Sequence, residues 1–87
     1  MTITIYSKPN CAFCVKSKAL VKSLGLIYEE KMFGKDFNSP EELYEAVGKQ
    51  VRTMPQIKID GELIGGYNQL VEYFVEKGKV NFKGEIV

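Results

Sequence analysis

The sequence predicts a single-domain α/β fold with the element order β-α-β-α-β-β-α. Three observations support this prediction. An alternating β-branched segment opens the chain, a helix-capping pattern precedes the middle helix, and an Asp-Gly pair separates two short apolar stretches. With 87 residues and neither internal repeats nor linkers, we expect one domain over residues 1–87.

The first half of the chain is predicted to form strand, helix and strand. The segment TITIY, residues 2–6, alternates in polarity and is β-branched, which is typical of a strand, and SKPN after it supplies turn residues. A helix follows, because side chains from residue 13 onward recur at helical spacing and Gly25 stands where a helix commonly ends. Residues 26–33 are apolar enough for a second strand. The side chains at helical spacing are Phe13, Ser17, Leu20, Val21 and Leu24.

The middle of the chain carries the clearest local signals. Ser39 and Glu42 form a capping-box pattern around Pro40, which suits the first position of a helix. Further on, Asp60-Gly61 is the dipeptide that a type I′ hairpin turn favours, because both central residues need a positive φ. We therefore expect a helix after residue 39 and two antiparallel strands around residues 60 and 61.

A third helix is predicted near the end of the chain. Asn68 suits its N-cap and Gly78 the position just after its last turn. The tail, residues 79–87, alternates weakly and has no assigned structure. The side chains at helical spacing in this segment are Leu70, Val71, Phe74 and Val75.

Composition argues against several classes of partner. The net charge is +1, and Lys and Glu are interspersed without a cluster of five like charges, so the sequence does not resemble a nucleic-acid binder. No apolar run is long enough to cross a bilayer, and the first residues lack the pattern of a secretory leader. We expect a cytoplasmic protein with neither nucleic-acid nor membrane partners.

The two cysteines, Cys11 and Cys14, are the strongest functional signal. In a reducing compartment such a pair is more often catalytic or metal-binding than structural. Residues three apart are neighbours on a helix, so the two sulfurs can meet. At a helix N-terminus the dipole and the free N–H groups lower a Cys pKa from about 8.5 into the range of roughly 3.5–7.5. This predicts Cys11 as the nucleophile and Cys14 as the thiol that closes the disulfide.

The pair has two other interpretations. A zinc site needs three or four protein ligands, whereas this chain has no His and no third Cys, so one chain does not complete such a site and no metal is expected. Alternatively, both cysteines pack as small hydrophobic residues, since Cys is often buried. The placement after a strand and at a helix start favours the redox interpretation.

The chain also resembles the glutaredoxin branch of the thioredoxin superfamily. The resemblance rests on YSKPNCAFC at residues 6–14, GKQVRTMPQIKID at 48–60 and IGGYNQL at 64–70. It implies a thioredoxin-like fold, a four-stranded mixed sheet with helices on both faces. It also implies a glutathione-dependent thiol-disulfide oxidoreductase, with glutathione as reductant and no tightly bound cofactor. Two departures are Ala12 and Phe13 where the family commonly has Pro and Tyr, and neutral amides at residues 68–69 where it often has acidic residues.

The resemblance also suggests a glutathione groove. It implies a cis peptide bond before Pro55, which would expose the backbone of Met54 to a substrate cysteine. Two glycines and the free N–H groups at the start of the last helix suit the γ-glutamyl carboxylate of glutathione. The predicted glutathione-binding residues are Lys8, Phe13, Thr53, Met54, Pro55, Gly66, Tyr67, Asn68 and Gln69.

Several of these residues have a second interpretation. Lys8 is a candidate for the glycyl carboxylate of glutathione, as are Gln50 and Arg52, although loop side chains of this kind are usually just solvated. Phe13 is expected in the core by default and otherwise as a wall of the groove. Tyr67 is either a packing residue at the helix start or a second wall. Tyr6 is expected to pack.

Two alternative functions remain open from the sequence. One is a thioredoxin-like hydrogen donor reduced by a flavoprotein reductase. The other is a carrier dimer in which Cys11 of each subunit and two glutathiones hold a [2Fe-2S] cluster. Under the leading hypothesis the protein is a monomer that reduces disulfide-bonded or glutathionylated proteins. The resemblance suggests ribonucleotide reductase among these acceptors.

Overall fold

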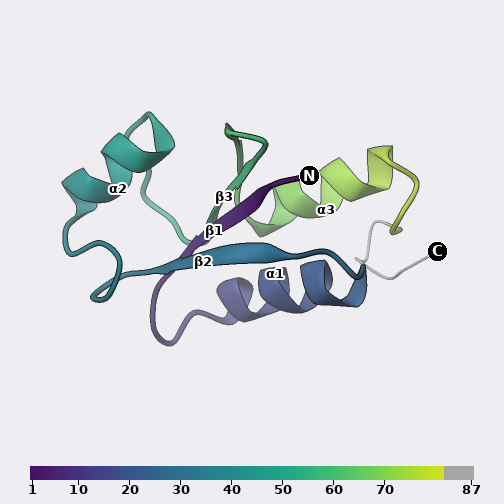
Figure 1. Ribbon diagram of the computed structural model, residues 1–87, viewed down its shortest axis with the longest axis horizontal. Coiled ribbons are helices and arrows are strands. Elements are labelled where there is room, and N and C mark those ends of the chain that lie inside the picture. Colours follow the sequence, from purple (N-terminus) through teal and green to yellow (C-terminus); the bar gives the residue numbers. More distant parts are fainter. Residues whose placement is uncertain (82–87) are drawn as a thin grey trace.

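A computed structural model describes residues 1–81 and shows a four-stranded mixed sheet with three helices (Figure 1). The strand order is β2-β1-β3-β4, with β1 parallel to β2 and antiparallel to β3, and with β3 antiparallel to β4. The predicted order of elements is confirmed. The elements are β1 (Ile3–Ser7), α1 (Ala12–Ser23), β2 (Tyr28–Met32), α2 (Pro40–Val47), β3 (Gln56–Ile59), β4 (Glu62–Gly65) and α3 (Tyr67–Glu76).

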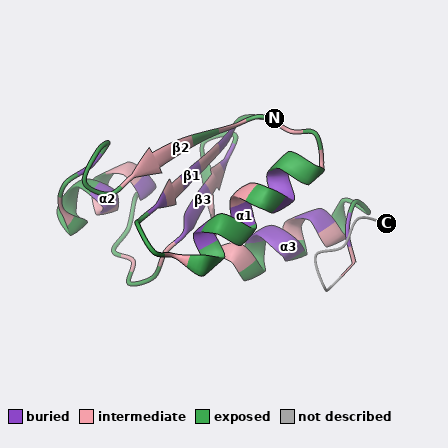
Figure 2. Cartoon of the chain, turned by 90° about the horizontal axis from the view of Figure 1, so that it is seen from below, coloured by how far each residue is buried: buried purple, intermediate pink, exposed green. Residues whose placement is uncertain are grey.

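The main core lies between one face of the sheet and the helices α1 and α3. Ile3 and Ile5 of β1 and Ile57 and Ile59 of β3 point to this face, since side chains two apart on a strand share a face. Helices α1 and α3 contact each other and lie side by side there (Figure 2). The N-terminus of α1 and that of α3 are thereby fixed relative to the sheet.

Helix α2 belongs to a smaller core of its own. Its buried side chains Leu43 and Val47 pack with Phe37 against partly buried Tyr6 and Leu63. Tyr6 alternates with Ile5 along β1, so this cluster lies on the sheet face opposite the main core. Figure 1 shows α2 well apart from α1 and α3. Helices therefore cover both faces of the sheet, as expected.

The predicted turn and capping residues behave as their chemistry requires. Ser39 caps α2 by accepting the backbone N–H of Glu42 at 3.2 Å, and Pro40 is the first helical residue. Asp60 and Gly61 both have positive φ, at 53° and 83°, in the turn between β3 and β4. Gly25 follows α1 with φ at 73°, a conformation that glycine adopts without steric cost. These local predictions are confirmed.

The start of α3 differs from the prediction. Asn68 was expected as the N-cap, but the N-cap is Gly66 and the helix begins at Tyr67. The reason is the side chain of Gln69, whose Oε1 accepts the backbone N–H of Gly66 at 3.0 Å. A glutamine three residues after the N-cap supplies half of a capping box, which satisfies the end of the helix two residues earlier than expected.

Part of the C-terminal tail can be assigned. Val80 is buried in the main core, and residues 82–87 lie outside the described part of the chain. Within residues 1–81, none of the helices has both the length and the apolar character needed to span a membrane.

Candidate active site

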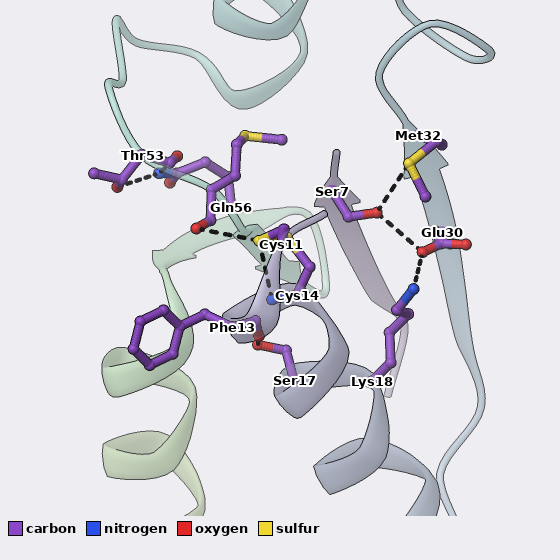
Figure 3. The surroundings of a disulfide bond; sticks show 11 residues. Ser7, Cys11, Phe13, Cys14, Ser17, Lys18, Glu30, Met32, Thr53 and Gln56 are labelled. Atoms are coloured by element: carbon purple, nitrogen blue, oxygen red, sulfur yellow. Dashed lines mark hydrogen bonds and ion pairs between the residues drawn. A yellow bond between two sulfur atoms is a disulfide. The ribbon is translucent and has the colours of Figure 1, made fainter. Parts of the chain in front are cut away.

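The loop between β1 and α1 places the two cysteines at the start of the helix. Cys11 is the N-cap of α1, with extended backbone angles, and Cys14 lies one helical turn later. Their Cα atoms are 5.2 Å apart and their sulfurs form a disulfide (Figure 3). This Cα separation lies within the range of about 4.4–6.8 Å that disulfides require. The prediction that the two sulfurs meet is confirmed.

The two sulfurs have different surroundings. Cys14 is only 1% exposed, whereas Cys11 is half-buried and reaches the surface. The sulfur of Cys11 accepts the backbone N–H of Cys14 at 3.2 Å, as an N-cap side chain does. None of the residues in the first turn of α1 is acidic, so the positive end of the helix dipole is not offset there. This arrangement favours a negative charge on Cys11 once the disulfide is reduced.

A backbone segment from the far end of the sequence lies against Cys11. The carbonyl oxygen of Met54 is 3.8 Å from the Cys11 sulfur, and the peptide bond between Met54 and Pro55 is cis, as expected. The side chain of Gln56 is buried and donates to the carbonyl oxygen of Thr53 at 2.7 Å. This hydrogen bond, made in Figure 3 on the far side of the disulfide from Ser7, ties the segment before Pro55 to β3.

A groove lies between the Met54–Pro55 segment, which contacts Cys11, and the start of α3. Its volume is about 210 Å³, and it brings together seven of the nine predicted glutathione-binding residues. The rings of Phe13 and Tyr67 stand at its edge with centroids 5.8 Å apart. The residues lining the groove are Phe13, Thr53, Met54, Pro55, Gly66, Tyr67 and Asn68.

Both aromatic residues of the groove had two possible roles. Phe13 is 52% exposed, so its expected place in the core is wrong. Its position in the first turn of α1 directs the ring to Tyr67 instead of to the sheet, and Lys16 Nζ lies 5.2 Å from the centre of that ring. Tyr67 combines its two roles, because it lines the groove and also packs against the main core. Tyr6 packs against Phe37, as expected.

The two remaining candidates lie outside the groove. The side chain of Gln69 is turned toward the N–H of Gly66, as described above. Lys8 lines a neighbouring pocket together with Arg52, Thr53 and Met54. Lys8 therefore lies near Thr53 and Met54, which also line the groove.

Comparison with known proteins assigns the family. The family model for glutaredoxin matches residues 3–64, which include both cysteines, Met54 and Pro55. The chain belongs to the glutaredoxin family. Glutaredoxin 3 of Escherichia coli K12 is 35% identical over 68 residues, which are 78% of this chain and 80% of that protein.

Two further relatives show how the glutaredoxin domain occurs elsewhere. The hybrid peroxiredoxin hyPrx5 of Haemophilus influenzae is 40% identical over 73 residues, or 84% of this chain, but the match spans only 29% of that longer protein. The structure of a buckwheat glutaredoxin-glutathione complex superposes with a TM-score of 0.71 at 26% identity, covering 86% of this chain and 69% of that one. The fold of this glutaredoxin domain is therefore the thioredoxin-like fold expected for the family.

A polar network on the other side of the disulfide was not anticipated from the sequence of this family member. Ser7 is fully buried, and its hydroxyl donates to Glu30 at 2.9 Å, while Lys18 Nζ lies 2.5 Å from the same carboxylate oxygen (Figure 3). The hydrogen bond from Lys18 lowers the pKa of Glu30 and outweighs the opposing effect of burial. Three elements, β1, α1 and β2, are thus joined directly beside the cysteines.

Among residues 1–81, no three His, Cys, Asp or Glu side chains are grouped so as to hold a metal ion.

Proposed function

We propose that this protein is a glutathione-dependent thiol-disulfide oxidoreductase that reduces protein disulfides and glutathione mixed disulfides through Cys11 and Cys14. The observation that carries the proposal is the asymmetry of the pair. The accessible sulfur of Cys11 is the N-cap of α1 and borders a groove, whereas Cys14 is buried beneath it. A thiolate is the attacking form in disulfide exchange, and helix N-termini stabilise it.

The proposed reaction has two exchange steps. The Cys11 thiolate attacks one sulfur of the substrate disulfide, a new bond joins Cys11 to that sulfur, and the other substrate sulfur leaves as a thiolate. Cys14, having lost its proton, then attacks the Cys11 sulfur, and the substrate leaves as a thiol. The resulting Cys11–Cys14 disulfide is reduced by two molecules of glutathione, which become glutathione disulfide. When Cys11 is joined to glutathione, a second glutathione thiolate resolves the bond instead: it attacks the glutathione sulfur, glutathione disulfide forms and Cys11 leaves as a thiolate. Two electrons pass from glutathione to the substrate.

The groove and the neighbouring pocket together offer a matching site for each part of glutathione. The backbone of Met54, whose carbonyl lies 3.8 Å from the Cys11 sulfur, suits the cysteinyl residue in an extended pairing. The N-terminus of α3, with Asn68 in its first turn, suits the γ-glutamyl carboxylate. Lys8 and Arg52 suit the glycyl carboxylate at the other end. The structure of a buckwheat glutaredoxin as a complex with glutathione supports glutathione as the ligand.

The remaining features of the proposal concern partners and location. The substrates are disulfide-bonded and glutathionylated proteins, with ribonucleotide reductase a candidate acceptor. The protein acts as a monomer in the cytoplasm, where glutathione is abundant and disulfides are usually transient. No cofactor is tightly bound. Support for these points comes from composition and from the family, and each is open to direct measurement.

Two single-cysteine variants test the proposal. Cys11→Ser should abolish turnover with every disulfide substrate, because it removes the attacking sulfur. Cys14→Ser should keep the removal of glutathione from a glutathionylated peptide and lose the reduction of a protein disulfide, because only the latter needs an internal resolving thiol. Glutathione and a flavoprotein reductase should be compared as electron donors. Activity retained in Cys11→Ser, or reduction by the reductase alone, would contradict the proposal.

A further inference from the structure

A second pocket lies beside the groove, and most of it plays no part in the proposed chemistry. Its volume is about 390 Å³, within the range of about 300–1,000 Å³ typical of ligand sites. We call it the α2 pocket, because α2 and the segment leading to it supply five of its ten lining residues. Its apolar lining includes Phe33, Phe37, Leu43, Tyr44 and Val51.

The α2 pocket and the groove at the active site share two lining residues. Thr53 and Met54 line both the α2 pocket and the groove, and the carbonyl oxygen of Met54 is 3.8 Å from the Cys11 sulfur. A polypeptide whose cysteine bonds to Cys11 therefore has its neighbouring residues close to the α2 pocket. In an extended chain each residue advances about 3.3 Å, so a side chain only a few positions from the cysteine reaches it.

One wall of the α2 pocket is formed by aromatic rings that pack edge to face and are partly exposed to solvent. Phe33 is 41% exposed, and its ring meets that of buried Phe37 edge to face with centroids 5.5 Å apart. The ring of Phe37 in turn meets that of Tyr6 at 6.1 Å. One side of the Phe33 ring therefore packs on Phe37, which itself packs on Tyr6. Its exposed side can contact another apolar group. A wall that is already in place lowers the cost of ordering on binding.

The charges of the α2 pocket have one sign. Lys8 and Arg52 line it, and both are exposed, whereas none of the described residues that line it is acidic. A partner that brings only an apolar side chain leaves these cations unpaired, and a partner with a nearby lysine or arginine is repelled. A carboxylate beside the apolar side chain is favoured by both residues.

We propose that the α2 pocket receives a large apolar side chain on the C-terminal side of the reacting cysteine of a disulfide-bonded polypeptide, while Lys8 and Arg52 face an acidic residue next to it. This inference rests on the proposed function. Its direction comes from the placement of glutathione, because the γ-glutamyl end lies at α3 and the chain beyond the cysteine therefore runs toward Lys8. The α2 pocket thus selects among protein substrates, whereas glutathione itself has no side chain to fill it.

Short peptides in mixed disulfide with thionitrobenzoate test this preference. The reduced Cys14→Ser protein attacks the peptide sulfur through Cys11, the new bond joins Cys11 to the peptide, and thionitrobenzoate leaves as a coloured thiolate. Thionitrobenzoate is the favoured leaving group because its thiol has the lower pKa. One series carries Phe followed by Asp at one, two or three positions after the cysteine. Matched peptides replace Phe by Ala, replace Asp by Lys, or place the same pair before the cysteine.

At one of the three tested positions, the peptide with Phe should react about tenfold faster than the peptide with Ala. This factor is the lower end of the free energy that burial of such a side chain supplies. Val51→Trp, which fills the α2 pocket, should remove this preference, and the matched Ile27→Trp variant, at an exposed site on the loop before β2, should retain it. Arg52→Glu should favour the peptide with Lys over that with Asp, whereas Lys22→Glu, at the last turn of α1, should not.

The mixed disulfide of glutathione with thionitrobenzoate separates the two hypotheses. If Val51→Trp, Ile27→Trp and Lys22→Glu release thionitrobenzoate from it at the rate of the parent protein, the proposed function stands and the peptide series alone decides the inference. Arg52→Glu should react with it more slowly, because Arg52 is proposed to face the glycyl carboxylate of glutathione. Equal rates for the Phe and Ala peptides at every position, or an equal preference when the pair precedes the cysteine, would overturn the inference. Loss of reaction with the glutathione disulfide in the parent protein would instead overturn the proposed function.

Discussion

Gly65→Ala should destabilise the start of α3 through a steric clash with the side chain of Gln69. Gly65 has φ at 119°, and a Cβ added there would lie 2.8 Å from Cγ of Gln69 and 3.1 Å from its Cβ. The Gln69 side chain would have to leave its place, and the N–H of Gly66 would lose its acceptor. Because Gly66 lines the groove, the perturbation reaches the proposed glutathione site.

The expected magnitude follows from two separate costs. An alanine forced into this positive-φ conformation costs about 1–3 kcal/mol, and the lost hydrogen bond adds about 1 kcal/mol. The free energy of unfolding should therefore fall by about 2–4 kcal/mol. The matched variant is Gly25→Ala, where φ is 73° but no atom lies within 4 Å of the added Cβ. It should lose about 1–2 kcal/mol, from the backbone alone.

Urea unfolding of a double-mutant cycle is the assay. Gly65→Ala and Gln69→Ala both remove the same hydrogen bond, so the double variant should be about 1 kcal/mol more stable than the sum of the two single effects predicts. The KM for a glutathione mixed disulfide should rise in Gly65→Ala and stay unchanged in Gly25→Ala. Additive effects within error, together with equal KM values in the two glycine variants, would refute this reasoning.

Three further outcomes are expected. Phe13→Ala should raise the KM for a glutathionylated peptide about threefold to tenfold, because aromatic pairs such as Phe13 with Tyr67 contribute about 0.5–1.5 kcal/mol. The loss of stability should be small, since the ring is half exposed. An unchanged KM would contradict the place of Phe13 in the groove. Glu30→Gln should lower the free energy of unfolding by about 0.5–1 kcal/mol at neutral pH. Because the hydrogen bond from Lys18 lowers the folded pKa of Glu30 from 4.5, this contribution is complete above about pH 4.5 and disappears as the pH falls through the folded value. A difference that does not shrink as the pH is lowered from 4.5 would show that the charge is not its source. Asn68→Asp should lower the KM for glutathione mixed disulfides by about twofold to fivefold. A carboxylate beside the groove can pair with the ammonium group of glutathione, and it also suits the N-terminus of α3. A raised KM would place that ammonium group elsewhere.

Much of the fold could be predicted because its determinants are local. The alternation of Ile3 and Ile5 with polar neighbours, the Ser39 cap and the Asp60-Gly61 turn each depend on a few adjacent residues. The N-terminus of α3 was placed two residues too late, because an asparagine is a common N-cap, while the glutamine side chain that satisfies Gly66 is a weaker signal.

The cysteine pair could be predicted from local spacing, whereas the groove could be predicted only in part. The pairing of Cys11 with Cys14 follows from helical spacing, and the groove residues come from the family resemblance. Phe13 fits the apolar stripe of its helix, and only the relation between α1 and α3 in space shows that it meets Tyr67 instead of the sheet.

The features that the sequence did not reveal join segments far apart in the chain. Ser7, Lys18 and Glu30 come from three different elements, and no spacing rule relates them. The α2 pocket combines Phe33, Leu43 and Val51 with Lys8, each of which has an ordinary role when it is considered alone. Such sites depend on tertiary packing, and the sequence pattern specifies only the elements that pack.

The ionisation of Cys11 tests the central claim most directly. The ultraviolet absorbance of the thiolate can be followed against pH in the reduced Cys14→Ser variant, where Cys11 is the only thiol. Because the sulfur caps α1 and accepts a backbone N–H at 3.2 Å, the titration should have its midpoint below about 7.5. A midpoint at about 8.5 or above, the value of an unperturbed cysteine, would contradict the account.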